Sequence, residues 1–184
     1  MTARPVLQQA DITRALTRIA HEILESSRGS ADLVLLGIPT RGVVLAQRIT
    51  QILNGIEPGC AVAGALDVTM YRDDLSRNPT RTPAPTAIPA GGIDGRTVVL
   101  VDDVLYSGRT IRAALDAIND IGRPRVVRLA ALVDRGHREL PIRADFVGKN
   151  LPSSKDERIF VRLEETDGVV DEVSIDGPTG GATA

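Results

Sequence analysis

The sequence lacks the features of a disulfide-linked, zinc-binding or membrane-spanning protein. A single cysteine, Cys60, excludes an internal disulfide framework and a zinc site built from several cysteines. No apolar run approaches the roughly 20 residues that span a bilayer, and residues 1–6 carry no apolar core of a signal peptide. We therefore expect a cytoplasmic protein with no membrane partner.

Aromatic residues and net charge are scarce as well. Aromatics make up 2% of the 184 residues, so the core must consist of Val, Ile, Leu and Ala. The formal net charge of -2 gives no overall attraction to nucleic acid, although a local basic face is still open. The composition is typical of one globular domain, which we place at residues 1–176, followed by a disordered tail at 177–184.

What the sequence does contain is a strand–loop–helix unit at residues 97–111. The apolar run 98–101 predicts a buried parallel strand, and Asp102 and Asp103 follow it directly. The small polar residues 107–110 then open a helix, and a loop of this kind binds anions through free backbone N–H groups. An isolated Asp-Asp pair could be merely solvated, but acids behind a buried strand favour a polar cleft. Together these features suit a ribose 5-phosphate.

Other periodic segments predict an α/β fold. Helical spacing covers residues 11–28, 43–53 and 111–121, and apolar runs predict strands at 33–38, 60–70, 126–133, 159–163 and 169–175. Strands that alternate with helices build a parallel-dominated central sheet flanked by helices. We expect the polar, irregular stretch 134–152 and the residues after it to form a small hood from parts of 134–163.

Residues 71–92 predict a lid. They contain four prolines and end near two glycines, so they cannot form a regular element. A loop of this length in a compact domain is often an active-site lid. Because it leads directly into the strand at 98–101, it should lie beside the acids.

Residues 98–110 resemble the phosphoribosyl-pyrophosphate (PRPP) motif of the type I phosphoribosyltransferases. The resemblance implies that fold, with the two acids holding the ribose hydroxyls, directly or through Mg²⁺, and residues 107–110 holding the 5′-phosphate. The implied PRPP-binding residues are Asp102, Asp103, Val104, Leu105, Tyr106, Ser107, Gly108, Arg109 and Thr110. Tyr106 stands where the 6-oxopurine enzymes carry an aspartate that binds the purine, so a purine substrate is disfavoured.

Two further segments are assigned to the diphosphate of PRPP. Residues 38–42 resemble the family's pyrophosphate loop, which implies that Thr40 and Arg41 meet the leaving diphosphate. Taken alone, this segment would be only a tight turn from strand to helix. Family members often have a non-proline cis peptide here, and the sequence leaves open whether it is kept. Arg72 could close over the leaving group and stabilise its developing charge, or could be a solvated loop arginine.

Four segments together resemble a narrower family, the bacterial bifunctional pyrimidine operon regulators and uracil phosphoribosyltransferases (PyrR). They are residues 15–22, 70–76, 102–110 and 134–145. The resemblance implies conversion of uracil and PRPP to UMP and diphosphate with Mg²⁺. It makes Asp102, Asp103 and Arg72 catalytic and brings Arg135 and Val161 to the base. It also implies regulation through binding of the pyr mRNA leader when UMP or UTP occupies the site.

Two basic segments could form the RNA surface, one on the first helix and one after residue 134. The candidate RNA-binding residues are Arg14, Thr17, Arg18, His21, His137, Arg138, Arg143 and Lys149. Against this, basic runs are more often solvated faces, and scarce aromatics leave few stacking platforms. Two alternatives stay open: an RNA-binding regulator that uses the site mainly as a UMP sensor, and a phosphoribosyltransferase for another base. We expect a homodimer or a higher homo-oligomer, in which a basic helix face would be most useful.

Overall fold

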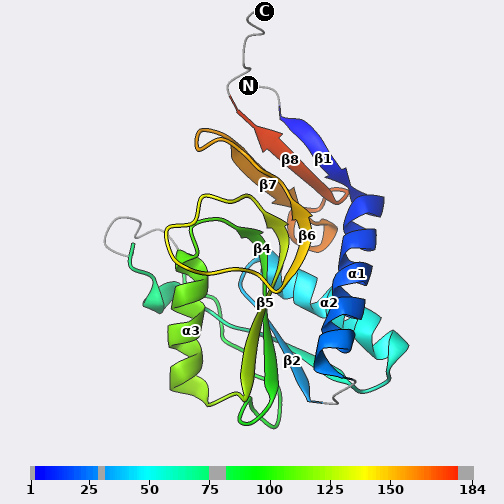
Figure 1. Cartoon of the computed structure of the whole chain (residues 1–184), viewed down its shortest axis with the longest axis vertical. Helices are drawn as coiled ribbons and strands as arrows, with labels where there is room; N and C mark the ends of the chain where they lie inside the picture. The colour runs from blue at the N-terminus through cyan, green and yellow to red at the C-terminus, as the bar shows by residue number, and fades with distance from the viewer. Residues whose placement is uncertain (1–2, 29–31, 75–81, 178–184) are drawn as a thin grey trace, which may run out of the picture.

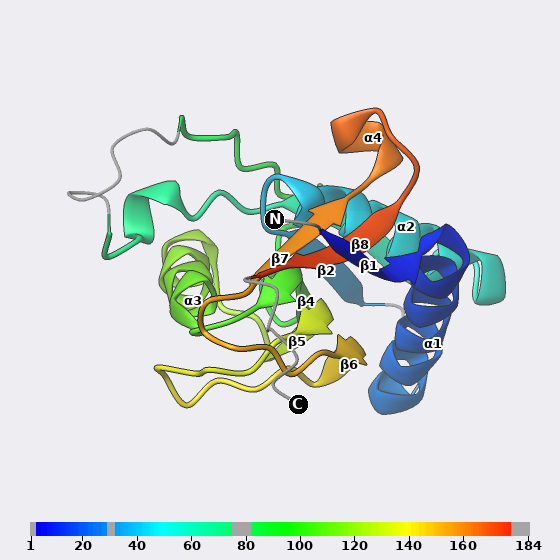
Figure 2. The ribbon, with the colours of Figure 1, turned by 90° about the horizontal axis from the view of Figure 1, so that it is seen from above.

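A five-stranded parallel sheet forms the centre of the computed structural model, which describes residues 3–28, 32–74 and 82–177. The elements of this core are α1 (Gln9–Ser27), β2 (Leu33–Gly37), α2 (Arg41–Ile56), β3 (Ala61–Ala65), β4 (Thr97–Leu105), α3 (Arg109–Ile121), β5 (Val126–Asp134) and β6 (Phe146–Asn150). The strand order is β3-β2-β4-β5-β6, and all neighbouring strands are parallel. Helices α1 and α2 cover one face of the sheet and α3 covers the other (Figures 1 and 2). This is the predicted α/β architecture, a parallel central sheet flanked by helices.

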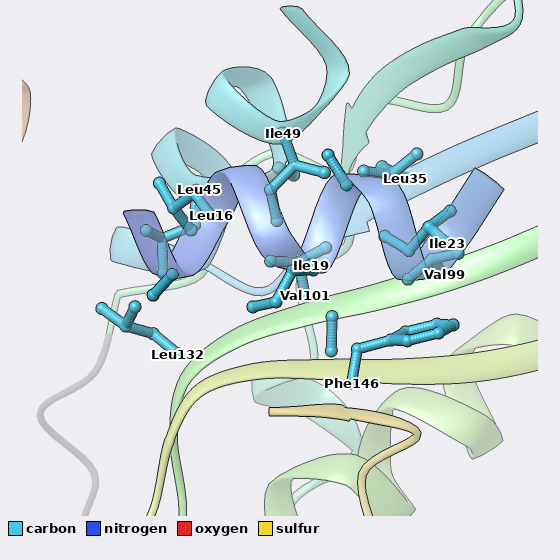
Figure 3. Close-up of a cluster of buried hydrophobic side chains, with 14 of the residues drawn as sticks. Leu16, Ile19, Ile23, Leu35, Leu45, Ile49, Val99, Val101, Leu132 and Phe146 are labelled. Carbon is cyan, nitrogen blue, oxygen red and sulfur yellow. The ribbon is translucent and has the colours of Figure 1, made fainter. Parts of the chain in front are cut away.

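The apolar run of β4 is buried because helices cover both of its faces. Successive side chains of a strand point to opposite faces of the sheet. Val98 and Leu100 accordingly pack in the cluster beneath α3. Val99 and Val101 pack in the other cluster, under α1 and α2, where Ile19 reaches them (Figure 3). Both faces of the strand are therefore apolar from Val98 to Val101, and its first charged side chains are those of Asp102 and Asp103.

A second, smaller sheet forms the hood. Its strands are β1 (Arg4–Gln8), β7 (Arg158–Arg162) and β8 (Glu172–Asp176), in the antiparallel order β1-β8-β7, with the short helix α4 (Glu164–Asp167) between β7 and β8. The predicted strands at 159–163 and 169–175 are present as β7 and β8. The hood nevertheless departs from the predicted range 134–163, because two of its three strands come from the ends of the domain. Strand β1 was not predicted.

The structure also corrects three predicted boundaries. Strand β4 continues through both acids, since it stays paired with β5 as far as Leu105 and Asp134. Strand β6 lies within the stretch predicted to be irregular, where its pairing with β5 and the buried side chain of Phe146 outweigh the polar sequence. Of residues 60–70, only Ala61–Ala65 is a strand, and a 3-10 turn, η1 (Thr69–Tyr71), follows.

Parts of two predicted segments lie outside the described residues. These are the middle of the lid, 75–81, and the tail from residue 178. The described second half of the lid returns past the edge of the sheet, where Ala87 pairs with Ala65 of β3. Among the described helices, none combines the length and the apolar character that crossing a membrane requires.

Arg48 of α2 attaches the hood to the sheet domain. Its guanidinium bonds both oxygens of Asp171, with Nη1–Oδ2 at 2.5 Å and Nη2–Oδ1 at 3.1 Å, and it also pairs with Glu165 of α4. The carboxylate of Asp171 is 3% exposed and accepts the backbone N–H of Glu164 as well. The hydrogen bonds from Arg48 hold the pKa of Asp171 below its usual value of 3.8.

We expect Asp171→Asn to lower the free energy of unfolding by about 3 kcal/mol at neutral pH, because it removes one partner of a buried ion pair. The lowered pKa means that this contribution is complete above the unfolded pKa and is lost as the pH falls through the folded pKa. Urea denaturation should therefore separate variant and wild type at neutral pH and bring them together in acid. Glu165→Gln is the matched control, since Glu165 is the half-exposed partner of the same arginine and should cost less than about 1 kcal/mol. Equal losses in the two variants would contradict the prediction.

Candidate active site

The two acids at the end of β4 serve different parts of one site. Asp102 is 8% exposed and lines a cavity of about 250 Å³, whereas Asp103 is half-buried. The negative charge of Asp102 acts on Arg72 of the lid, and that of Asp103 acts on Arg41 of the 38–42 loop. The backbone orients both carboxylates. The Asp103 N–H donates to Asp102 Oδ1 at 3.0 Å, and the Val104 N–H donates to Asp103 Oδ1 at 2.8 Å.

Residues 107–110, here called the phosphate loop, lie at the start of α3 and line the same cavity. Backbone N–H groups at a helix start have no partners inside the helix, which makes this end of the cavity suitable for an anion. Gly108 has a φ of 92°, in the left-handed region that favours glycine. Glu139 and Leu140 donate their backbone N–H groups to the Ser107 carbonyl at 2.9 and 3.2 Å, so the loop is held from outside the cavity.

The described start of the lid lies against α3 and the phosphate loop. Arg72 bonds both oxygens of Asp74 at 2.9 Å, and its Nη1 donates to Thr110 Oγ1 at 3.3 Å. Asp73 accepts Nη1 of Arg109 at 2.6 Å, which carries the lid to the loop's own arginine. Tyr71 donates to Asp120 of α3, and this bond raises the pKa of the Tyr71 hydroxyl. Arg72 therefore lies at the phosphate end of the cavity in this state, rather than beside Thr40 and Arg41.

The 38–42 loop lies directly in front of the acids. The Ile38 N–H donates to the carbonyl oxygen of Val101 at 2.9 Å, one residue before the acid pair. The peptide bond between Pro39 and Thr40 is cis, which answers the question that the sequence left open. Thr40 is exposed, and Arg41 opens α2.

Arg41 reaches across to the hood. Its Nε and Nη2 donate to the two oxygens of Asp167 in α4, at 3.1 and 2.7 Å. This bidentate pair, together with the nearby charge of Asp103, raises the pKa of Arg41. It joins residues 126 positions apart in the chain, and no motif or spacing predicts it.

Arg135 and Val161, which the resemblance assigns to the base, are both buried next to the site region. Neither lines the cavity. Arg135 is 8% exposed, and it donates to Ser153 Oγ and to the carbonyl oxygens of Ser154 and Glu157, at 2.8 to 3.0 Å. Val161 is buried in the hydrophobic core. Arg135 thus fixes residues 153–157, which lead into β7 of the hood.

Tyr106 is the aromatic side chain that lines the cavity. It is 39% exposed and lines the cavity beside the phosphate loop. The guanidinium of Arg135 stacks on its ring at 4.2 Å from the centroid, and the His137 ring lies edge-on at 6.2 Å. The sequence assigned Tyr106 to PRPP binding and used it to argue against a purine, and its place in the cavity also makes it a candidate for contact with the base.

The predicted RNA-binding residues divide into bonded and unbonded groups. Helix α1 lies beside the edge strand β6, and Arg18 of α1 donates to the carbonyl oxygens of Val147 and Gly148 (Figure 1). Within the described ranges, the residues of this set with internal hydrogen bonds are Arg14, Thr17, Arg18, His137 and Arg138. The side chains of His21, Arg143 and Lys149 are exposed and have no hydrogen bond or ion pair within the same ranges. Lys149 of β6 lies beside α1, whereas Arg143 belongs to the loop between β5 and β6; α1, β6 and this loop are together called the basic surface.

Arg138 connects this basic surface to the cavity. Its Nη1 donates to the carbonyl oxygen of Tyr106 at 2.8 Å, and its Nη2 pairs with Asp134 at 2.5 Å. Its Nε donates to the carbonyl oxygen of Ile142. The segment that holds the phosphate loop thus also carries His137 and Arg143 on the basic side.

Comparison with known proteins was made on sequence and on structure. A family profile described as "Phosphoribosyl transferase domain" matches residues 5–165. The chain is 72% identical over 173 residues to the "Bifunctional protein PyrR" of Leifsonia xyli subsp. xyli, covering 91% of this chain and 94% of that one. It is 67% identical over 166 residues to the protein of the same description from Streptomyces coelicolor, covering 90% and 86%.

Solved structures support the same architecture. A hypoxanthine-guanine phosphoribosyltransferase from Bacillus anthracis superposes with a TM-score of 0.72 at 16% identity, covering 93% of this chain and 96% of that one. The hypoxanthine phosphoribosyltransferase of Trypanosoma cruzi gives a TM-score of 0.71 at 16% identity, with 95% and 97% covered. At this identity the likeness concerns the fold alone.

Proposed function

The chain belongs to the phosphoribosyltransferase domain family and, within it, to the bifunctional PyrR proteins, and we infer that it is a uracil phosphoribosyltransferase that also regulates pyrimidine biosynthesis genes. The reaction is uracil plus PRPP giving UMP plus diphosphate. One observation carries the catalytic half: the acid pair lies between a cavity at a helix start, which Asp102 lines, and the loop that carries Arg41 and is bonded to β4 just before the acids. PRPP has the same order of groups, with its ribose between the 5′-phosphate and the diphosphate.

Each part of PRPP then has a place along the site. The phosphate loop, Ser107 to Thr110, takes the 5′-phosphate at the N-terminus of α3. Asp102 and Asp103 hold the ribose hydroxyls, and their negative charge stabilises the positive charge that develops on the sugar as the diphosphate leaves. Thr40 and Arg41 receive that diphosphate. We keep Arg72 as a lid residue that moves from Thr110 toward the substrate when the lid closes.

Tyr106 supports a pyrimidine as the second substrate. Its ring is held by Arg135 and is exposed to the cavity, and it offers no carboxylate to the imidazole edge of a purine. The alternative is a phosphoribosyltransferase for another base. A competition assay would separate the two, because an excess of hypoxanthine or guanine should leave UMP formation unchanged.

Mg²⁺ fits the site as an ion that arrives with the substrate. No group of three or more His, Cys, Asp or Glu side chains that could hold a metal occurs among the residues the structure describes. Mg²⁺ characteristically keeps several waters and binds one or two carboxylates plus substrate phosphates, which is the set that Asp102, Asp103 and PRPP would supply. When bound, the ion neutralises charge on the diphosphate.

The decisive test of the catalytic half is release of diphosphate from PRPP on addition of uracil, with Mg²⁺ present. Purified protein should release diphosphate only when both substrates are added, and UMP should form in equal amount. Release that does not depend on uracil, or no release at all, would contradict the enzyme activity.

The second half of the function is binding to the pyr mRNA leader. The observation in its favour is the basic surface formed by α1, β6 and the loop before β6, on which the exposed side chains of His21, Arg143 and Lys149 are available for phosphates. Arg138 contacts both this surface and the carbonyl of Tyr106, so occupancy of the cavity by UMP or UTP can bias the surface. We propose that this regulation takes place in the cytoplasm and that a homodimer presents two such surfaces to the RNA.

We expect UMP to tighten binding of a pyr leader fragment about tenfold, and by linkage the RNA must tighten UMP binding by the same factor. Both affinities can be measured by fluorescence titration, each with and without the other ligand. Arg143→Ala should weaken RNA binding and reduce its salt dependence, while Lys155→Ala, outside the basic surface, should change neither. RNA binding that ignores UMP would rule out the sensor mechanism. Strong linkage in a protein without turnover would favour the alternative of a regulator that only senses UMP.

A further inference from the structure

We propose that Asp167 of the hood helix α4 is a positioning residue for the diphosphate end of PRPP, and that it acts through Arg41. The proposal rests on the proposed function, because the 38–42 loop has a diphosphate to receive only if PRPP is the substrate. Asp167 was not predicted from the sequence. It lies in the hood, and it meets the loop only in the folded chain (Figure 2).

The carboxylate of Asp167 is held from two sides. Its Oδ2 accepts the backbone N–H of Leu163 at 2.9 Å, which ties the side chain to the start of its own short helix. The same oxygen accepts Nε of Arg41, and Oδ1 accepts Nη2 of Arg41. Two parallel hydrogen bonds to a planar guanidinium fix its orientation as well as its distance. Arg41 is therefore locked in one geometry before any substrate arrives.

Locking Arg41 leaves it able to bind an anion. A guanidinium carries five N–H donors, and the pair with Asp167 uses one on Nε and one on Nη2. Within the described residues, the remaining donors have no other acceptor. Side-chain entropy is lost on ordering an arginine, and here that loss occurs on folding rather than on binding of PRPP.

A second carboxylate explains why Arg41 needs to be held. The charge of Asp103 also acts on Arg41, and the loop is bonded to β4 just before the acid pair. Without Asp167, Asp103 would be the remaining carboxylate whose charge acts on Arg41. A direct pair between Arg41 and Asp103 would occupy the acid that has to hold the ribose. Asp167 thus keeps the arginine and the ribose acid apart.

The test is Asp167→Asn, which keeps the shape of the side chain. The amide oxygen can still accept the Leu163 N–H, but the charge is lost and an NH₂ group competes for the face that meets Arg41. We expect the Kd and the KM for PRPP to rise about tenfold, with kcat changing less than about threefold and the KM for uracil unchanged. Direct titration of the protein with PRPP gives the Kd without any turnover.

Three comparisons separate positioning from a merely structural role. Glu165→Gln, on the same helix but paired with Arg48, should leave the Kd for PRPP unchanged. In an Arg41→Gln background, Asp167→Asn should have no further effect on the Kd, since the two residues act as one unit. Asp167→Glu keeps the charge at a different reach and should raise the Kd by about threefold. It also provides the measurement if the asparagine variant does not fold.

Three results would contradict the role assigned to Asp167. Tighter binding of PRPP by Asp167→Asn would mean that the carboxylate competes with diphosphate, and an unchanged Kd would mean that it has no part in binding. A loss that persists in the Arg41→Gln background would point to folding alone. Each of these results would overturn the proposal. If the wild type binds PRPP but forms no UMP, the proposed activity fails, while the binding comparison still decides the role of Asp167.

Discussion

Replacing Asp103 by asparagine is expected to lower kcat about 100-fold, which corresponds to about 2.7 kcal/mol of lost transition-state stabilisation. Asp103 is half-buried at the end of β4, and its charge reaches Arg41 on the diphosphate side of the site. As the diphosphate leaves, positive charge grows on the sugar, and a fixed carboxylate stabilises that charge more than it stabilises bound PRPP. The amide cannot do so, although it has almost the same size.

Folding should hardly change in this variant. The one hydrogen bond recorded for the Asp103 side chain is accepted from the Val104 N–H, and an asparagine oxygen can accept it equally well. The measurements are kcat from diphosphate release and the unfolding midpoint in urea. Asp116→Asn, an exposed acid on α3, is the matched control and should leave both unchanged. Turnover within twofold of the wild type would remove Asp103 from the catalytic groups.

Adding one methyl group at Gly42 is expected to damage both stability and PRPP binding. A Cβ at this position would lie 2.4 Å from the carbonyl oxygen of Val101, so the first turn of α2 must move away from β4. Overpacking against rigid backbone costs about 2 kcal/mol. The shift also displaces Thr40 and Arg41 from the acid pair, and we expect the KM for PRPP to rise at least about tenfold.

Gly55→Ala provides a control on the same helix. No atom lies within 4 Å of the position that its Cβ would take, so the substitution should raise stability by up to about 1 kcal/mol through the higher helix propensity of alanine. Urea denaturation and PRPP kinetics on the two variants give the comparison. If Gly42→Ala behaved like Gly55→Ala, the close contact between α2 and β4 would not be required for the site.

The parts of the site that are local in sequence could be predicted. The run 98–101, the acids and the phosphate loop follow one another within a single strand–loop–helix unit, so their order alone fixes how they meet. The same holds for the fold, because apolar runs alternating with helical periods leave few arrangements other than a parallel sheet. The end of β4 was placed too early, because the acids were read as the end of the strand, whereas backbone pairing with β5 carries it to Leu105.

The parts that depend on distant pairs could not be predicted. Arg135 was assigned to the base by resemblance, and its hydrogen bonds to a segment about 20 residues further along could not be foreseen. Arg41 was expected to meet the diphosphate, but its orientation by a carboxylate 126 residues away could not be foreseen. Neither partner leaves a signal in composition or periodicity. A charged residue read from sequence indicates a possible contact, and only the fold decides which of several anions it meets.

The small sheet of the hood has a consequence for synthesis on the ribosome. Strand β1 precedes α1 in the chain, but the strand it pairs with, β8, comes more than 160 residues later. The helices and strands from α1 to β6 can assemble before β8 is available, since all of these segments leave the ribosomal exit tunnel earlier than β8 does. A nascent chain therefore contains its phosphate loop well before the partners of Arg41 and Arg48 in the hood are synthesised.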